Sequence, residues 1–200
     1  MTRGLPRFRG TALVAALCAA LVLPALPGCV GVAVVAGVGA TAMVATDRRT
    51  TGAQMDDESI ELKIATAASS SYGANEVHLN VTSYNATVLL TGEIPNDTVR
   101  KDLVKVARGT ERVKAVEDYM VIGPPSDLGA RSNDTYITSK VKARFLESDK
   151  FSGKDIKVVT ERSTVYLMGI VRRDEGAAAA QVAATTAGVA RVVKVFEYTN

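Results

Sequence analysis

The chain has 200 residues, of which 47% are hydrophobic and 22% are charged, and its formal net charge is +3. All three excess positive charges are at the N-terminus, on Arg3, Arg7 and Arg9, so the rest of the chain holds 21 basic and 21 acidic residues. Because a neutral chain does not provide the basic surface of a nucleic-acid-binding protein, we expect no nucleic-acid partner.

The N-terminus has the pattern of an export signal. The three arginines are followed by an apolar run over residues 11–26, and Pro27 and Gly28 then lead to Cys29. The run is short for a transmembrane helix, which needs about 20 apolar residues. An uncleaved signal anchor is the alternative, since apolar residues resume after Cys29, but prolines and glycines interrupt any single helix through both parts. We therefore predict a signal peptide over residues 1–28.

Residues 26–29, Leu-Pro-Gly-Cys, resemble a bacterial lipobox, although Pro27 stands where a small residue is usual. The resemblance implies a diacylglyceryl group on the Cys29 sulfur, cleavage before it and acylation of the new amino group. Val30 follows, and not the aspartate that retains lipoproteins in the inner membrane. We therefore expect a lipid anchor in the outer membrane, facing the periplasm, with about 0.8 kcal/mol from each buried methylene.

Chemistry for catalysis is sparse in the rest of the chain. Cys18 would leave with the signal and Cys29 would carry lipid, so no thiol remains for a disulfide or a cysteine metal site. His78 is the only histidine, and we interpret it as a solvated residue on the polar side of a strand. Without a second histidine or a thiol, we expect no metal site, no cofactor besides the covalent lipid, and no enzyme activity. A hydrolase would be a third functional class, and no residue set supports it.

After a predicted lipidated stem over residues 29–55, the chain repeats itself with a constant offset of 77 residues. The matching pairs include Ile60 and Ile137, Lys63 and Lys140, Ile64 and Val141, Val81 and Val158, Leu90 and Leu167, and Gly92 and Gly169. We therefore predict two copies of one module, over residues 56–123 and 134–200, joined by a linker over residues 124–133.

Each copy shows the order helix, strand, strand, helix, strand. In the first copy, Asp56, Asp57 and Glu58 come before a helix over residues 59–69 and are expected to stabilise its positive end. Its other elements are expected at residues 77–81, 87–92, 95–107 and 113–122, and those of the second copy at residues 134–148, 155–161, 163–171, 173–187 and 190–199. This predicts an α+β fold in which each copy is a three-stranded sheet covered by two helices. Contact between two such small units would help to stabilise both.

This paired pattern, with a strand ending in Gly92 or Gly169 and a last strand of Val-x-x-Val type, resembles the BON domain. The stretches at residues 45–48, 80–84, 132–135 and 165–169 support the resemblance, which covers nearly all of the mature chain. It implies two tandem BON domains in an outer-membrane lipoprotein that binds anionic phospholipids, supports envelope integrity and gathers at division sites.

The two copies differ in charge. Residues 56–123 hold 7 basic and 11 acidic residues, whereas residues 134–200 hold 11 basic and 8 acidic residues. Because an anionic bilayer attracts each nearby Lys or Arg by about 1 kcal/mol, the second copy is the candidate for membrane contact.

The first helix of the second copy carries the candidate lipid site. Tyr136, Lys140 and Arg144 form a stripe that in the first copy has only one cation, Lys63. A tyrosine suits a membrane interface, and the long basic side chains can reach phosphate. The residues predicted to bind phosphatidylglycerol or cardiolipin are Tyr136, Ile137, Lys140, Val141, Arg144 and Phe145, of which the apolar three also form the core stripe.

Two alternatives stay open at this point. The stripe is also compatible with a solvated basic face that carries a partly packed tyrosine. The protein is also compatible with an adaptor, in which residues 56–123, or the strand that ends at Asn200, dock an outer-membrane assembly machine or a cell-wall factor.

Overall fold

The structure is a computed structural model, and it describes residues 47–199. The predicted signal peptide, Cys29 and all but the end of the predicted stem lie outside the described residues. Within residues 47–199, no helix is both long enough and apolar enough to span a bilayer.

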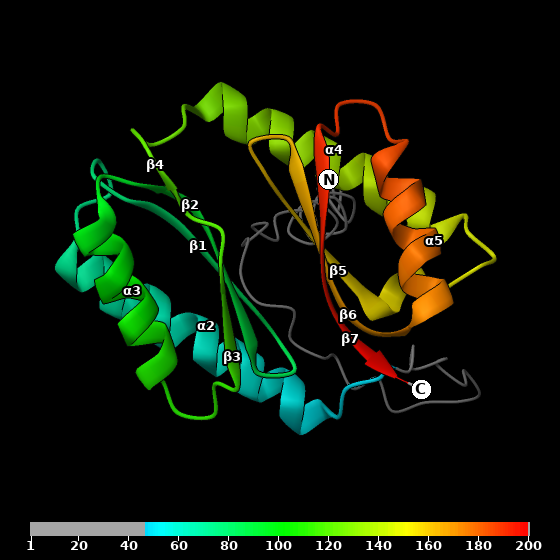
Figure 1. Cartoon of the computed structure of the whole chain (residues 1–200), viewed down its shortest axis with the longest axis horizontal. Coiled ribbons are helices and arrows are strands. Elements are labelled where there is room, and N and C mark those ends of the chain that lie inside the picture. The colour runs from blue at the N-terminus through cyan, green and yellow to red at the C-terminus, as the bar shows by residue number, and fades with distance from the viewer. Residues whose placement is uncertain (1–46, 200) are drawn as a thin grey trace, which may run out of the picture. The chain divides into compact units, whose positions relative to one another are not determined.

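Domain 1 is a small α+β unit (Figure 1). Its elements are α2 (Thr51–Ser71), β1 (His78–Tyr84), β2 (Thr87–Ile94), α3 (Asp97–Gly109), β3 (Ala115–Asp118) and β4 (Val121–Ile122). Strand β1 is antiparallel to β2, and β2 runs parallel to β3 and β4. The two helices cover one face of this sheet, where Ile60 and Ile64 of α2 and Leu103 of α3 pack against Val88 and Leu90.

Domain 2 repeats this arrangement, which confirms the predicted α+β fold. Its elements are α4 (Leu128–Leu146), the short 3-10 helix η1 (Gly153–Asp155), β5 (Ile156–Glu161), β6 (Thr164–Arg172), α5 (Arg173–Ala184) and β7 (Arg191–Thr199). Strand β6 lies between antiparallel β5 and parallel β7. Helices α4 and α5 cover one face through residues such as Val141, Phe145 and Ala179.

Both first helices begin earlier than the sequence pattern predicts. Helix α4 begins at Leu128, inside the predicted linker, because the Asp127 carboxylate accepts a hydrogen bond from the Ala130 amide. Helix α2 begins at Thr51, where the Thr50 hydroxyl accepts from the Ala53 amide. In both cases a capping side chain starts the helix before its apolar stripe begins.

The last strand of domain 1 is interrupted, whereas a continuous strand was predicted. Strands β3 and β4 pair with β2 in one unchanged register, and the break lies opposite Gly92, whose φ is +112°. At the break, the Met120 amide donates a hydrogen bond to the Asp118 carboxylate and not to strand β2. Glycine is required at this position and at its repeat Gly169, because a Cβ atom on Gly169 would lie 2.6 Å from the Asp155 carbonyl oxygen.

A buried carboxylate holds the hairpin turn in each domain. Asp57 accepts hydrogen bonds from the amides of Asn85 and Ala86 at 2.8 Å, and its repeat Asp134 accepts from Arg162 and Ser163 at 2.8 Å. These turn residues all have positive φ, the conformation of a tight two-residue hairpin turn. The prediction that Asp57 comes before the helix and stabilises its positive end is therefore wrong, since Asp57 lies buried within α2.

The second face of each sheet is also apolar. Tyr84 and Leu89 of domain 1 pack with Tyr166 and Met168 of domain 2, and we call these four residues the interdomain cluster. Successive residues of β2 and β6 therefore point into different cores, which explains why both strands are apolar without alternation.

Candidate functional site

Helix α4 presents an aromatic side chain and a cation together. Tyr136 is 62% exposed, and the Lys140 Nζ atom lies 4.5 Å from the centre of its ring, in a cation–π contact. Lys140 also donates a hydrogen bond to the Ala187 carbonyl oxygen. Arg144, one turn further on, donates from Nη1 to the Val182 carbonyl oxygen at 2.9 Å and to the Thr186 hydroxyl at 2.8 Å. The predicted stripe therefore exists, with its two cations held against the end of α5 and the loop after it.

The other three predicted lipid residues have a different place. Ile137, Val141 and Phe145 are at most 1% exposed and belong to the core of domain 2. Phe145 packs edge-on against Phe151 with 5.0 Å between the ring centres. They fix α4 to the sheet and offer no atoms to a headgroup in this structure, so lipid contact by α4 stays a prediction that rests on Tyr136, Lys140 and Arg144.

Helix α4 also carries two exposed leucines that were not predicted. Leu128 and Leu146 are both largely exposed, at the two ends of α4. They are separated by five helical turns, about 27 Å, and so lie on the same line along the helix. The spacing of 18 residues would have placed Leu128 and Leu146 on one side of a helix. This was missed because residue 128 was assigned to the linker.

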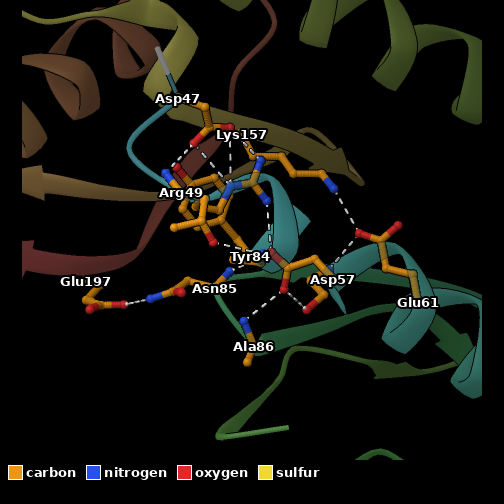
Figure 2. Close-up of polar contacts among 12 residues, drawn as sticks. Asp47, Arg49, Asp57, Glu61, Tyr84, Asn85, Ala86, Lys157 and Glu197 are labelled. Carbon is orange, nitrogen blue, oxygen red and sulfur yellow. Dashed lines mark hydrogen bonds and ion pairs between the residues drawn. The ribbon is translucent and has the colours of Figure 1, made fainter. Parts of the chain in front are cut away.

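The chain enters domain 1 through a polar network (Figure 2). Arg49 donates to both Asp47 and the buried Asp57, at 2.8 and 2.9 Å, and its guanidinium lies 4.0 Å from the centre of the Tyr84 ring. Burial raises the pKa of Asp57, but its hydrogen bonds from Ser83, Ala86, Asn85 and Arg49 outweigh this and lower it overall. Asp57 is thus a charged acceptor that joins the hairpin turn to the start of the described chain.

The side chain of the neighbouring Arg48 contacts domain 2. It donates two hydrogen bonds of 2.8 Å to Glu175 and one of 2.9 Å to the Ile170 carbonyl oxygen, and its Nε atom lies 3.2 Å from Asp155. The hydrogen bonds from Arg48 lower the pKa of Glu175 to about 2. We call Asp47, Arg48 and Arg49 the N-terminal clamp, because successive arginines bind the two domains. In the sequence, the only sign of this segment was that residues 45–48 support the resemblance to BON-domain proteins.

Within residues 47–199, one group of side chains could hold a metal ion: His78, Glu93 and Glu161. His78 Nδ1 lies 2.8 Å from Glu93 Oε2, and the His78 side chain is only 14% exposed. The interpretation of His78 as a solvated residue is therefore wrong. Burial raises the pKa of Glu161, which comes from domain 2.

Comparison with known proteins supports the repeat. The profile of the BON domain matches residues 56–124 and 133–200. The chain is similar to the outer membrane lipoprotein DolP of Haemophilus influenzae, with 37% identity over 174 residues that cover 86% of this chain and 90% of the relative. It is also similar to a 21 kDa hemolysin of Actinobacillus pleuropneumoniae, with 32% identity over 76% of this chain and 79% of the relative. The osmotically-inducible protein Y of Escherichia coli is 29% identical over 58% of this chain and 59% of its own length.

Proposed function

The chain belongs to the BON-domain family, and on this premise we propose that it is a lipid-anchored outer-membrane protein whose second domain binds anionic phospholipids. The similarity to the outer membrane lipoprotein DolP of Haemophilus influenzae supports the location, as does the lipobox-like sequence ending at Cys29. Support of envelope integrity, at division sites, belongs to the same proposal and follows from the family resemblance.

The observation that carries lipid binding is the exposed Tyr136 with the Lys140 ammonium beside its ring. A tyrosine ring lies well at the level of lipid headgroups, and an ammonium group there attracts lipid phosphate. Leu128 and Leu146, exposed at the two ends of the same helix on a line about 80° around it from Tyr136, would add apolar contacts. Helix α4 would therefore lie along the membrane surface, held rigid by its buried core residues.

The lipid anchor makes a weak headgroup site sufficient. Seventeen residues separate Cys29 from Asp47, a tether of at most about 60 Å when fully extended. A site confined so close to the bilayer meets headgroups at a high effective concentration, and so is occupied even when its intrinsic affinity is low. In this mechanism the acyl chains fix the protein to the membrane and α4 orients it.

Vesicle binding by the soluble fragment 46–200 tests the proposal without the anchor. We expect binding to vesicles that contain phosphatidylglycerol or cardiolipin, little binding to neutral vesicles, and a fall in binding with added salt. Tyr136→Ala removes an exposed ring and should weaken binding several-fold. Replacing both Lys140 and Arg144 by Glu should weaken it further by reversing two charges.

Leu62→Ala is the matched control, because Leu62 is an exposed apolar residue on α2, the equivalent helix of domain 1. Circular dichroism must show that each variant is folded, which matters most for Arg144 with its hydrogen bonds to α5 and the residues that follow it. Equal binding by wild type and folded Tyr136→Ala, or equal binding to neutral and anionic vesicles, would contradict lipid recognition by α4.

One observation favours a second function, the protein adaptor. Although domain 1 is acidic overall, α3 borders a groove of ≈ 410 Å³ around Val104, where four basic residues outnumber the one acid, Asp118, which pairs with Arg100. The basic residues are Arg100, Lys101, Lys105 and Arg108. Its charge suits an acidic segment of a partner protein. Photo-crosslinking from position 101 in cells distinguishes the functions, since a protein adduct there supports the adaptor and a lipid-only adduct does not.

A further inference from the structure

The group formed by His78, Glu93 and Glu161 lies where the two domains meet. His78 begins β1 and faces Glu93 of β2 in the antiparallel register, while Glu161 ends β5 of domain 2. The three side chains are 14%, 0% and 6% exposed. Two buried carboxylates and an imidazole therefore converge from both domains on one point.

The spacing of these atoms suits a small divalent cation. His78 Nδ1 is 2.8 Å from Glu93 Oε2 and 3.8 Å from Glu161 Oε1, and one ligand atom from each residue lies within 4.8 Å of the others. Ligands of a tetrahedral zinc ion, each about 2.0–2.1 Å from the metal, are about 3.3 Å apart. The observed separations therefore lie on both sides of the distance between ligands of one zinc ion.

One ligand atom has no partner in the described chain. Glu93 Oε1, on a fully buried side chain, accepts no hydrogen bond from residues 47–199, and the Arg162 guanidinium stays 3.8 Å away with its own side chain 58% exposed. A buried carboxylate oxygen without a donor is costly, and more so beside a second carboxylate. The group therefore holds a buried carboxylate oxygen that lacks a hydrogen-bond donor among residues 47–199.

The surrounding residues orient the group as outer partners of a metal site do. The Asn80 amide donates to Glu161 Oε2 at 2.6 Å, and the Ser126 backbone amide donates to Glu93 Oε2 at 3.1 Å. On its open side the group borders a pocket of ≈ 360 Å³ lined also by Arg131 and Thr138, which gives access for an ion and its water.

The internal repeat provides an independent comparison. Glu161 is the repeat of Tyr84, and His78 is the repeat of Asp155, each 77 residues apart. Tyr84 of domain 1 donates to the Asp155 carbonyl oxygen of domain 2 at 3.1 Å. This contact corresponds to the approach of His78 and Glu161, with each position now supplied by the other domain. At that equivalent place the cation is supplied by Arg48, which neutralises Asp155 and Glu175. At the His78 end the guanidinium paired with Glu93 is that of Arg162, which is 3.8 Å away and belongs to a largely exposed side chain.

From these observations we propose that His78, Glu93 and Glu161 bind one Zn²⁺ ion, or a similar first-row divalent ion, that links the two domains. An imidazole nitrogen with two carboxylates is a ligand set for such metals, whereas Mg²⁺ and Ca²⁺ prefer oxygen ligands alone. The ion would neutralise both carboxylates and join β1 and β2 to β5. This site is independent of lipid binding by α4.

The test is a Zn²⁺ titration of the full-length protein in detergent, free of affinity tags, against a chromogenic chelator. We expect one Zn²⁺ per chain, a higher melting temperature with Zn²⁺, and little effect of Mg²⁺. His78→Asn and Glu161→Gln should each weaken binding at least about tenfold, since loss of even an outer partner of a metal ligand costs 10–100-fold. They should also abolish the thermal shift.

Glu147→Gln, at an exposed carboxylate just after α4, is the matched control and should bind Zn²⁺ like the wild type. Because His78 is the only histidine, its imidazole ¹⁵N signals report on the site directly and must move with one equivalent of Zn²⁺. The proposal is overturned by absence of saturable binding in the micromolar range, by equal binding in folded His78→Asn, or by binding that leaves these signals in place.

Discussion

At the scale of single residues, Asp57 and Asp134 show how one side chain can define a module. Each is a buried carboxylate on the first helix of its domain that reaches the two amides of a hairpin turn. The repeat offset of 77 relates the two positions, so the sequence contained the signal. Local reasoning assigned Asp57 to the helix dipole instead, because the partners lie 28 and 29 residues further along the chain.

We predict that Asp134→Ala lowers the free energy of unfolding by about 2–3 kcal/mol, since it leaves two turn amides without a charged acceptor. Asp57→Ala should cost more, because Asp57 also accepts from Ser83 and Arg49. Urea unfolding of the 46–200 fragment measures both. Asp149→Ala, at an exposed acid in the loop after α4, is the control and should change stability by less than about 0.5 kcal/mol. A cost for Asp134→Ala as small as that of the control would disprove the role of the turn carboxylate.

At the scale of elements, periodicity predicted the helices and strands well and their ends poorly. The stripes of Ile60 and Ile64 and of Ile137 and Val141 are the buried faces of α2 and α4, as predicted. The starts of both helices depend on single capping residues. The break between β3 and β4 lies opposite the positive φ of Gly92. A pattern of apolar residues contains neither kind of information. The contacts of Arg48 in the N-terminal clamp escaped prediction for a similar reason, because its partners Ile170 and Glu175 lie more than 100 residues away.

The clamp gives a prediction about pH. The pKa of Glu175 falls from 4.5 to about 2 in the folded protein, so the folded state favours its charged form. The stabilisation is therefore complete above pH 4.5 and is lost as the pH falls towards 2. Arg48→Ala should destabilise the protein by about 2 kcal/mol at pH 7 and by progressively less below pH 4.5. Chemical unfolding at several pH values measures this, and a difference that does not change with pH would argue against the ion pair as its source.

At the scale of the whole molecule, the repeat predicted two α+β modules, but it did not reveal the sites that form between them. Neither His78 with Glu161 nor Arg48 with Glu175 is close in sequence, and each set becomes a site only when residues of different segments meet. The expectation that a lone histidine indicates no metal site considered histidines and thiols alone. Folding adds two carboxylates to that histidine, which is why the candidate zinc site required the structure.

The interdomain cluster makes a last prediction about how the molecule unfolds. Because Tyr84 and Leu89 share one core with Tyr166 and Met168, neither sheet keeps both faces buried when the other domain is lost. Met168→Ala should therefore cost about 2–5 kcal/mol and weaken domain 1 as well as domain 2. Hydrogen exchange separates these effects, since amides of β2 should lose protection together with those of β6.

The control for this experiment is Met55→Ala, at an exposed methionine on α2, which should leave exchange in both sheets unchanged. Faster exchange in β6 with unaltered exchange in β2 would mean that the domains unfold separately. Loss of protection in both sheets would mean instead that the two repeats form one cooperative unit, which carries helix α4, the N-terminal clamp and the candidate ion site.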